Sequence, residues 1–255
     1  MEKMCLVLVA YQMHPIYPII IAANRDEYYQ RATASAHYWD DCPEILAGRD
    51  LEKMGTWMGV TKTGRFAALT NYRDPKEETK GKRSRGELVA DSLQYKGNTV
   101  DYMKKLAESN DLYPGYNLLT GNREELYYYS NISKELIKVD PGVHGVSNHL
   151  LNTSWPKVQR GKNGMKKMIS ESNQDKLIAN LFSLLQHSDP APDSELPSTG
   201  ISLEWERLLS PMFIKSDHYG TRCSTVLLLS NQDIHYVERV YNNGEMNERS
   251  FHIPG

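Results

Sequence analysis

The chain has 255 residues, of which 40% are hydrophobic and 24% charged, and its formal net charge is −2. This composition is typical of globular proteins, and the near balance of charge gives no electrostatic reason to expect nucleic acid as a partner. The three cysteines form no Cys-x-x-Cys pair and so predict neither a disulfide framework nor a zinc knuckle, which fits a cytoplasmic protein. No apolar run approaches the ~18 residues of a membrane span, and the first residues are too short for a signal peptide.

Short apolar runs separated by turn residues fill the first seventy positions and predict strands at residues 5–11, 18–23, 45–48, 55–61 and 65–71. The period then changes, and apolar residues at helical spacing predict two helices between Glu87 and Leu106, broken at Gly97-Asn98. The remaining elements are expected to be strands at 116–120, 125–129, 136–139 and 144–147, helices at about 157–171 and 174–187, a loop at 188–200, and two final strands at 224–229 and 234–240.

Many antiparallel strands interrupted by paired helices indicate an α+β protein. The continuous apolar runs at 19–21 and 226–229 imply strands that are covered on both faces. A four-layer αββα sandwich, in which two sheets pack between two helical layers, satisfies both observations. Because no internal repeat or linker divides the chain, residues 1–255 are expected to form one domain.

The tetrad Asn24-Arg25-Asp26-Glu27 follows the second predicted strand, and Cys5 opens the first. Two adjacent strands would place a thiol, a guanidinium and carboxylates within reach of one another. A cysteine at the amino terminus can use its own α-amino group, with a pKa of ~7.7–8.0, as the base that removes its proton. The spacing alone also fits a cysteine that packs in the core and a charged turn in solvent.

Three further polar residues lie at the ends of predicted strands: Asn71, Asn148 and Arg222. An asparagine amide can donate to a developing oxyanion, and an arginine near a thiol favours the thiolate. The alternatives are asparagines that cap turns and an arginine in a surface ion pair. Cys223 is a second thiol candidate, although packing explains it equally well.

Other chemistry has little support in the sequence. There is no phosphate-binding loop, no dinucleotide fingerprint and no nucleophile elbow, and the histidines are scattered, so we expect neither a cofactor nor a metal. The basic cluster Lys80-Gly81-Lys82-Arg83-Ser84-Arg85 is short and follows Glu77-Glu78, which predicts an exposed loop.

Several blocks, in order along the chain, resemble the signature of the NRDE family, also called the transport and Golgi organisation protein 2 family. These blocks are Met4-Cys5-Leu6-Val7-Leu8, Asn24-Arg25-Asp26-Glu27, Gly55-Thr56-Trp57, Thr70-Asn71-Tyr72-Arg73, Gly145-Val146-Ser147-Asn148 and Tyr219-Gly220-Thr221-Arg222. That family is similar in fold to the N-terminal nucleophile hydrolases, including penicillin V acylase and conjugated bile salt hydrolase.

The resemblance implies a cysteine amidohydrolase that cleaves a small non-peptide amide through an acyl-thioester. It assigns Cys5 as the nucleophile, with Arg25 and Asp26 as its electrostatic partners. Asn71 would donate to the oxyanion, and Asn148 would be a second polar anchor. Arg222 would be the arginine that the family pattern carries late in the sequence. We expect substrate contacts from Asn24, Trp57 and Tyr72. The Cys5 amine is free only if translation starts at Met4 or residues 1–4 are removed.

A second hypothesis stays open, in which the chain keeps this fold without catalysis and binds or traffics a hydrophobic ligand such as haem or lipid. A homo-oligomer is compatible with both hypotheses.

Overall fold

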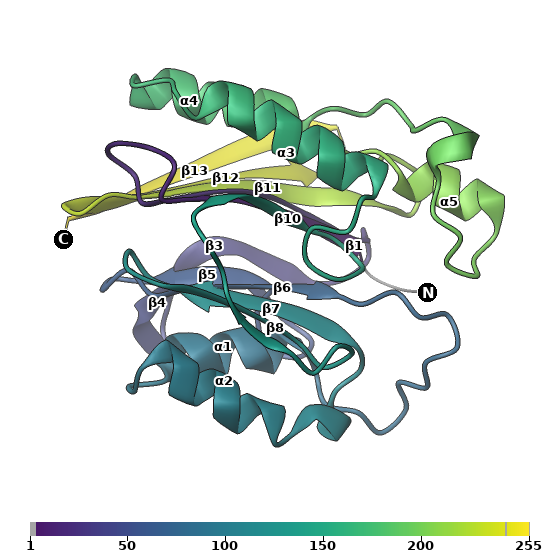
Figure 1. The fold of residues 1–255 in the computed structure, drawn as a ribbon, viewed down its shortest axis with the longest axis horizontal. Helices are drawn as coiled ribbons and strands as arrows, with labels where there is room; N and C mark the ends of the chain where they lie inside the picture. Colours follow the sequence, from purple (N-terminus) through teal and green to yellow (C-terminus); the bar gives the residue numbers. More distant parts are fainter. Residues whose placement is uncertain (1–3, 243, 255) are drawn as a thin grey trace.

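The computed structural model describes residues 4–242 and 244–254, which form two antiparallel sheets packed face to face between two layers of helices. Figure 1 shows the four layers in order, with α3 and α4 above one sheet and α1 and α2 below the other. The predicted αββα sandwich is confirmed. Among the described residues, no helix is long and apolar enough to cross a membrane.

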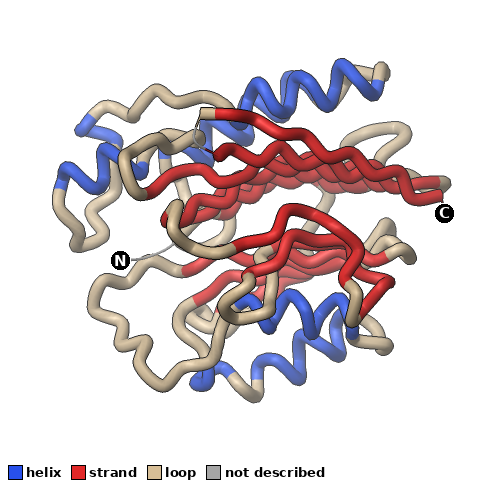
Figure 2. The backbone as a smooth tube through the Cα atoms, turned by 180° about the vertical axis from the view of Figure 1, so that it is seen from behind, coloured by secondary structure: helices blue, strands red, loops and turns tan. Residues whose placement is uncertain are grey.

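The first sheet carries both Cys5 and the tetrad. Its strands, in spatial order, are β10 (Gly142–Val146), β1 (Met4–Tyr11), β2 (Ile19–Tyr28), β11 (Tyr219–Leu229), β12 (Asp233–Asn242) and β13 (Glu245–Pro254). Its outer face is covered by α3 (Pro156–Met168) and α4 (Gln174–Leu185). Strands from the two ends of the chain, β2 and β11, therefore lie side by side in the middle of this sheet. Figure 2 shows the strands of both sheets in red, seen from behind.

The second sheet is built from the central part of the chain. Its strands, in spatial order, are β3 (Thr33–Trp39), β4 (Cys42–Asp50), β5 (Met58–Thr61), β6 (Phe66–Asn71), β7 (Tyr116–Gly121), β8 (Leu126–Ser130) and β9 (Leu136–Lys138). Helices α1 (Gly86–Gln94) and α2 (Thr99–Ala107) cover its outer face, and the short α5 (Leu203–Leu209) lies at one end of the molecule.

Alternation along β1 explains why its sequence is an unbroken apolar run. Val7 and Val9 belong to the core between the two sheets, whereas Leu6 and Leu8 belong to the core beneath α3 and α4. Successive side chains of a strand point to opposite faces, so a strand that is covered on both faces must be apolar at every position. Burial of each such side chain contributes about 1.5–3 kcal/mol.

The sequence analysis did not predict β3, α5 or β13, and it predicted β2, β4 and β11 shorter than they are. β13 was not expected because most of its residues are polar and exposed, as befits an edge strand, and the half-exposed β3 and the seven-residue α5 gave weak patterns. β2 and β11 are longer than predicted because their polar ends remain paired in the sheet. Both extensions carry candidate site residues.

Candidate active site

A cavity of about 390 Å³ lies at the ends of strands from both sheets, beside the loop that precedes α1. The first sheet contributes residues of β1, β2, β11 and β12, and the second contributes residues of β3, β4 and β6. Six of the nine residues singled out in the sequence line this cavity: Cys5, Arg25, Asp26, Trp57, Asn71 and Arg222. The fold therefore brings together residues from widely separated segments.

The Cys5 side chain shares the inner face of β1 with Val7 and is only 7% exposed. Burial, followed by the negative charge of Asp26, raises the pKa of the Cys5 thiol to about 12, although Arg25 and the backbone N–H of Asp26 oppose this shift. The thiol is therefore protonated at neutral pH. It needs a nearby base to become a nucleophile, because the thiolate is the reactive form.

Met4 precedes Cys5 within β1, so the Cys5 nitrogen is a peptide nitrogen here. The Met4 side chain is fully buried in a cluster with Leu209, Ile214 and Tyr219, and the Met4 N–H donates to the Tyr219 hydroxyl at 2.7 Å. In this form of the chain, Met4 is bonded to the nitrogen that would be the terminal amine if Cys5 were the first residue. Residues 1–3 lie outside the described residues.

The tetrad Asn24-Arg25-Asp26-Glu27 lies inside β2, which corrects the expectation that it follows the strand. Strand alternation separates its side chains, so Arg25 and Glu27 share one face and Asn24 and Asp26 the other. Arg25 is the cross-strand partner of Cys5, and its Nη2 lies 3.4 Å from Glu27 Oε2. The guanidinium is therefore on the same face as the thiol.

Asp26 is a buried carboxylate whose two oxygens differ in their contacts with the described residues. Its Oδ1 accepts a hydrogen bond from Thr221 Oγ1 at 2.6 Å, whereas its Oδ2 has no hydrogen-bond partner among the described residues. Burial raises the pKa of Asp26 to about 6, against the opposing positive charge of Lys157. Because Asp26 and Met4 are cross-strand partners, this carboxylate lies beside the peptide that links Met4 to Cys5.

Asn71 and Asn148 are connected through the backbone. Asn71 is the last residue of β6 and lines the cavity. Asn148 is fully buried outside the lining, and its Nδ2 donates to the carbonyl oxygen of Asn71 at 2.9 Å. The Ser147 hydroxyl lies 2.8 Å from the Cys5 carbonyl oxygen and 3.0 Å from Asn148 Oδ1. Asn148 therefore fits a residue that positions Asn71, rather than one that touches a ligand.

Arg222 lies at an irregularity in β11, between Thr221 and Cys223, where the register with β2 shifts. Its Nη1 donates to the carbonyl oxygens of Tyr28, Tyr29 and Arg31 at 2.9, 3.1 and 3.2 Å. Bulges of this kind redirect a side chain and are common near functional sites. These contacts hold the turn after β2, and burial lowers the pKa of Arg222.

Two expected substrate contacts do not reach the cavity. Asn24 lies on the helical face of β2, where its Nδ2 donates to the carbonyl oxygens of Leu185 and Met212 at 2.9 and 2.7 Å. Tyr72 lies next to His149, with ring centroids 5.1 Å apart. Neither side chain lines the cavity, so both assignments are corrected: Asn24 joins β2 to the helical layer, and Tyr72 packs beyond the end of β6.

The sequence analysis did not identify the buried charged residues near Cys5. Arg73 and Glu206 form a buried ion pair with Nη1 and Oε2 2.6 Å apart, and the buried Lys157 donates from Nζ to the Leu209 carbonyl oxygen at 3.1 Å. Burial lowers the pKa of Lys157 to about 8, against the attraction of Asp26. Buried charges are costly unless they are paired, so such a cluster marks a candidate functional site. Lys157 gave no signal, because a lysine at a helix start is usually solvated.

The second thiol in the cavity lining is buried close to a carboxyl group. Cys223 and Glu238 both line the cavity, and Glu238 Oε2 accepts from the backbone N–H of Ala36 at 2.6 Å. Burial and the neighbouring Glu238 charge raise the pKa of the Cys223 thiol well above its usual value, and burial raises the pKa of Glu238. Cys223 therefore fits a buried part of the cavity wall better than a nucleophile.

The cavity lining is predominantly basic. The acidic residues are Asp26, Glu27, Asp50 and Glu238, and they face twice as many basic residues, which are Arg25, Arg31, Arg49, Lys53, Lys82, Arg83, Arg85 and Arg222. Three of these basic residues come from the cluster expected to be an exposed loop. It is a loop, but it also forms part of the cavity wall. Arg31, Arg49 and Arg83 also pair with carboxylates outside the lining, those of Glu52, Asp41 and Glu87, and the positive charge that remains attracts anions.

Two solved structures share this fold. The N-acylethanolamine-hydrolyzing acid amidase ortholog of Caenorhabditis elegans aligns with a TM-score of 0.53 and 10% identity over 88% of this chain and 92% of that chain. A mutant conjugated bile acid hydrolase from Clostridium perfringens aligns with a TM-score of 0.50 and 9% identity over 97% and 92%. These likenesses, with the two-sheet architecture, define an N-terminal nucleophile hydrolase fold.

The sequence comparisons identify the family within that class. The family model for Transport and Golgi organisation 2 matches residues 4–243. The homologs of this name from Mus musculus and Homo sapiens are 32% and 33% identical over 260 residues, which is 92% of this chain and 92% of each relative. The Drosophila melanogaster protein is 27% identical over 278 residues, 96% of either chain. The chain belongs to the transport and Golgi organisation 2 family.

Proposed function

We propose that the chain, when Cys5 is its first residue, is a cysteine amidohydrolase that cleaves a small non-peptide amide through an acyl-thioester. One observation carries this proposal: a protonated thiol opens to a cavity beside a buried carboxylate whose Oδ2 has no hydrogen-bond partner among the residues described. A terminal ammonium on Cys5 would supply the donor that Asp26 lacks, and the free amine would supply the base that the thiol lacks.

The reaction has two half-reactions. In the first, the α-amine of Cys5 takes the thiol proton, sulfur attacks the amide carbonyl carbon, and Asn71 with a backbone N–H stabilises the oxyanion. The carbon–nitrogen bond then breaks as the α-ammonium protonates the leaving amine, which leaves an acyl-thioester. In the second, the α-amine takes a proton from water, hydroxide attacks the thioester, and the carboxylic acid and the thiol are released.

The same geometry predicts that the chain which retains Met4 is inactive. Its Cys5 nitrogen is a peptide nitrogen without basicity, and the thiol, whose pKa is raised to about 12, stays protonated. Removal of residues 1–4 would therefore be an activation step. It would also vacate the buried space now filled by the Met4 side chain, next to Tyr219.

The lining favours an anionic substrate. About 390 Å³ fits a small molecule, and basic residues outnumber acidic ones two to one around the cavity. An amide that carries a carboxylate or a phosphate fits this charge pattern. The amide-hydrolase titles of the two structural neighbours lend support through the shared fold alone.

The test compares two purified forms, one starting at Cys5 and one with residues 1–4 retained, for release of free amine from N-acyl amides with and without a carboxylate. We expect turnover only in the form that starts at Cys5, faster for anionic amides, and none in its Cys5→Ser variant. Circular dichroism and thermal melting verify that all three are folded. Equal amine release by the Cys5→Ser variant would refute the assignment of the nucleophile.

A further inference from the structure

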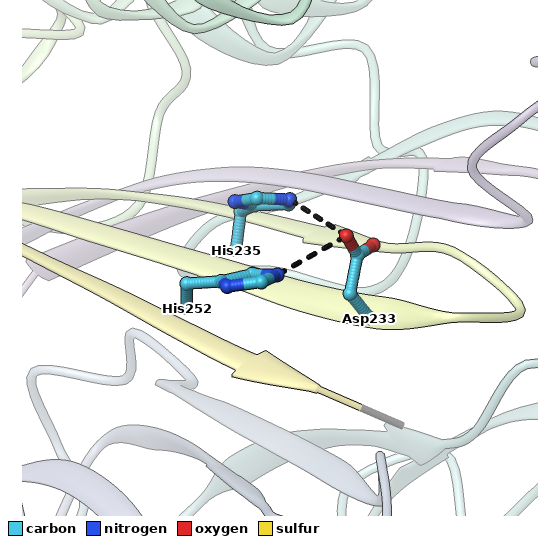
Figure 3. Close-up of side chains that lie close together, drawn as sticks. All are labelled: Asp233, His235 and His252. Carbon is cyan, nitrogen blue, oxygen red and sulfur yellow. Dashed lines mark hydrogen bonds and ion pairs between the residues drawn. The ribbon is translucent and has the colours of Figure 1, made fainter.

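A cluster of two histidines and one aspartate lies far from the cavity, on the hairpin of β12 and β13. Asp233 and His235 are two residues apart on β12, so their side chains share a face, and His252 is the cross-strand partner of His235. Figure 3 shows both imidazole rings directed at the same Asp233 carboxylate. The cluster could not be recognised in the sequence, because His252 lies beside His235 only when β13 pairs with β12.

The ligand atoms are spaced as a metal ion requires. The Nε2 atoms of His235 and His252 lie 3.1 and 3.2 Å from Asp233 Oδ2, and suitable ligand atoms of all three residues lie within 4.8 Å of one another. A tetrahedral zinc ion with bonds of about 2.0–2.1 Å separates its ligands by roughly 3.3–3.4 Å, so small side-chain movements would accommodate it. The two rings are stacked, with centroids 4.7 Å apart, which keeps both nitrogens on one side.

Neighbouring side chains hold the cluster in place. The Gln174 side chain lies 3.3 Å from His235 Nδ1 and accepts a hydrogen bond from the Tyr17 hydroxyl at 2.9 Å. With its amide group turned over, Gln174 would accept from a protonated His235 Nδ1, as the second ring nitrogen of a metal-bound histidine requires, and would donate to the Tyr17 hydroxyl oxygen. The Ser230 hydroxyl donates to Asp233 Oδ1 and leaves Oδ2 to the histidines.

Local charge also favours a cation. The pKa of Tyr17 is raised by burial and by the carboxylates of Asp233 and Asp175, which places negative potential on this side of the hairpin. Hydrogen bonding alone would have two imidazoles donate to a single carboxylate oxygen. One dication could instead bind all three side chains at once, with each imidazole neutral and its proton on Nδ1 rather than Nε2.

We propose that Asp233, His235 and His252 bind one divalent transition-metal ion of the zinc type, with water completing its coordination. The site joins the edge strand β13 to β12 and so stabilises the end of the sheet. It is independent of the cavity, because His235 lies on the face of β12 toward the helices, whereas Glu238 and Val240, three and five residues further on, line the cavity. In Figure 1 the C-terminal end of β13 lies at the left of the molecule, whereas the start of β1 lies at the right.

The test is titration of the full chain, stripped with a chelator, with zinc chloride in a calorimeter and with cobalt chloride in an absorption spectrometer. We expect one saturable site, visible d–d bands with cobalt, and a melting temperature that rises with zinc. Asp233→Asn and His252→Ala should each weaken zinc binding at least tenfold. His218→Ala is the matched control, since His218 is exposed and outside the cluster, and it should bind like the wild type.

His252 is exposed, so its replacement by alanine should leave the fold intact, which circular dichroism verifies. Failure of the wild type to bind zinc saturably below about 1 mM would show that the cluster is only a hydrogen-bonded triad. Wild-type affinity in folded His252→Ala protein would equally overturn the proposal.

Discussion

Replacement of Asp26 by asparagine should stabilise the protein at neutral pH and abolish its proposed activity. Asp26 is 1% exposed, and burial raises its pKa from 3.8 to about 6 despite the positive charge of Lys157. Its ionised form is therefore less stable in the folded protein than in water. The ionised Asp26 side chain thus lowers the stability of the folded protein, and it lies beside the proposed nucleophile. Both properties are expected of a carboxylate that is retained for function.

The magnitude and the sign follow from the pKa. The folded chain holds a proton on Asp26 between pH 4 and 6 that the unfolded chain has lost, so the free energy of unfolding falls as pH rises through that window and then levels off. The rise of the Asp26 pKa from 3.8 to about 6 corresponds to roughly 3 kcal/mol at pH 7. Asp26→Asn removes this penalty, so the variant should match the wild type near pH 4 and exceed it by up to roughly 3 kcal/mol at pH 7.

Urea denaturation of the wild type and Asp26→Asn from pH 4 to 8 measures this difference. Asp50→Asn is the control of opposite sign, because hydrogen bonds from Arg31 lower the pKa of Asp50 against the effect of burial. That variant should be destabilised at pH 7 and approach the wild type as pH falls. A difference between Asp26→Asn and the wild type that does not change with pH would refute the assignment of a buried, raised-pKa carboxylate.

Three further outcomes test the site. In the protein that starts at Cys5, Asn71→Ala should lower kcat by ~10²–10³-fold with little change in KM, as expected for an oxyanion donor; an unchanged kcat would remove Asn71 from that role. Lys53→Glu should raise KM for an anionic amide by roughly two- to fivefold and leave a neutral amide unaffected, whereas Lys80→Glu, which changes the same charge outside the lining, should alter neither. Because burial lowers the pKa of Lys157 to about 8, the unfolding free energy should rise between pH 8 and 10, and Lys157→Met should abolish that rise.

The layered fold was predictable because its signals are local. The apolar runs of β1 and β2 and the helical period of α1 and α2 each reflect burial of one segment, and burial fixes the layer in which that segment lies. The half-exposed β3 and the exposed β13 escaped detection because each lies at the edge of its sheet and carries no continuous apolar run, although each pairs with a strand adjacent in the sequence. No local pattern of hydrophobicity encodes an edge strand of this kind.

The site was predictable only where motif position and strand geometry agree. Cys5 and Arg25 could be placed together because adjacent antiparallel strands pair them directly. Asn24 was misplaced because the sequence alone does not show that β2 continues through the tetrad, which puts alternate residues on opposite faces. Lys157 could not be found at all, since the burial of its ammonium group depends on the packing of α3 against the first sheet.

The most direct measurement of the central claim is intact-mass spectrometry of the protein that starts at Cys5, incubated with an N-acyl amide or an activated acyl ester. The proposed chemistry predicts one added acyl group, mapped to Cys5, released by hydroxylamine and missing in both the Cys5→Ala variant and the chain that retains residues 1–4. A folded protein with a free terminal Cys5 that stays unmodified, or that acquires its acyl group on Cys223, would contradict the account.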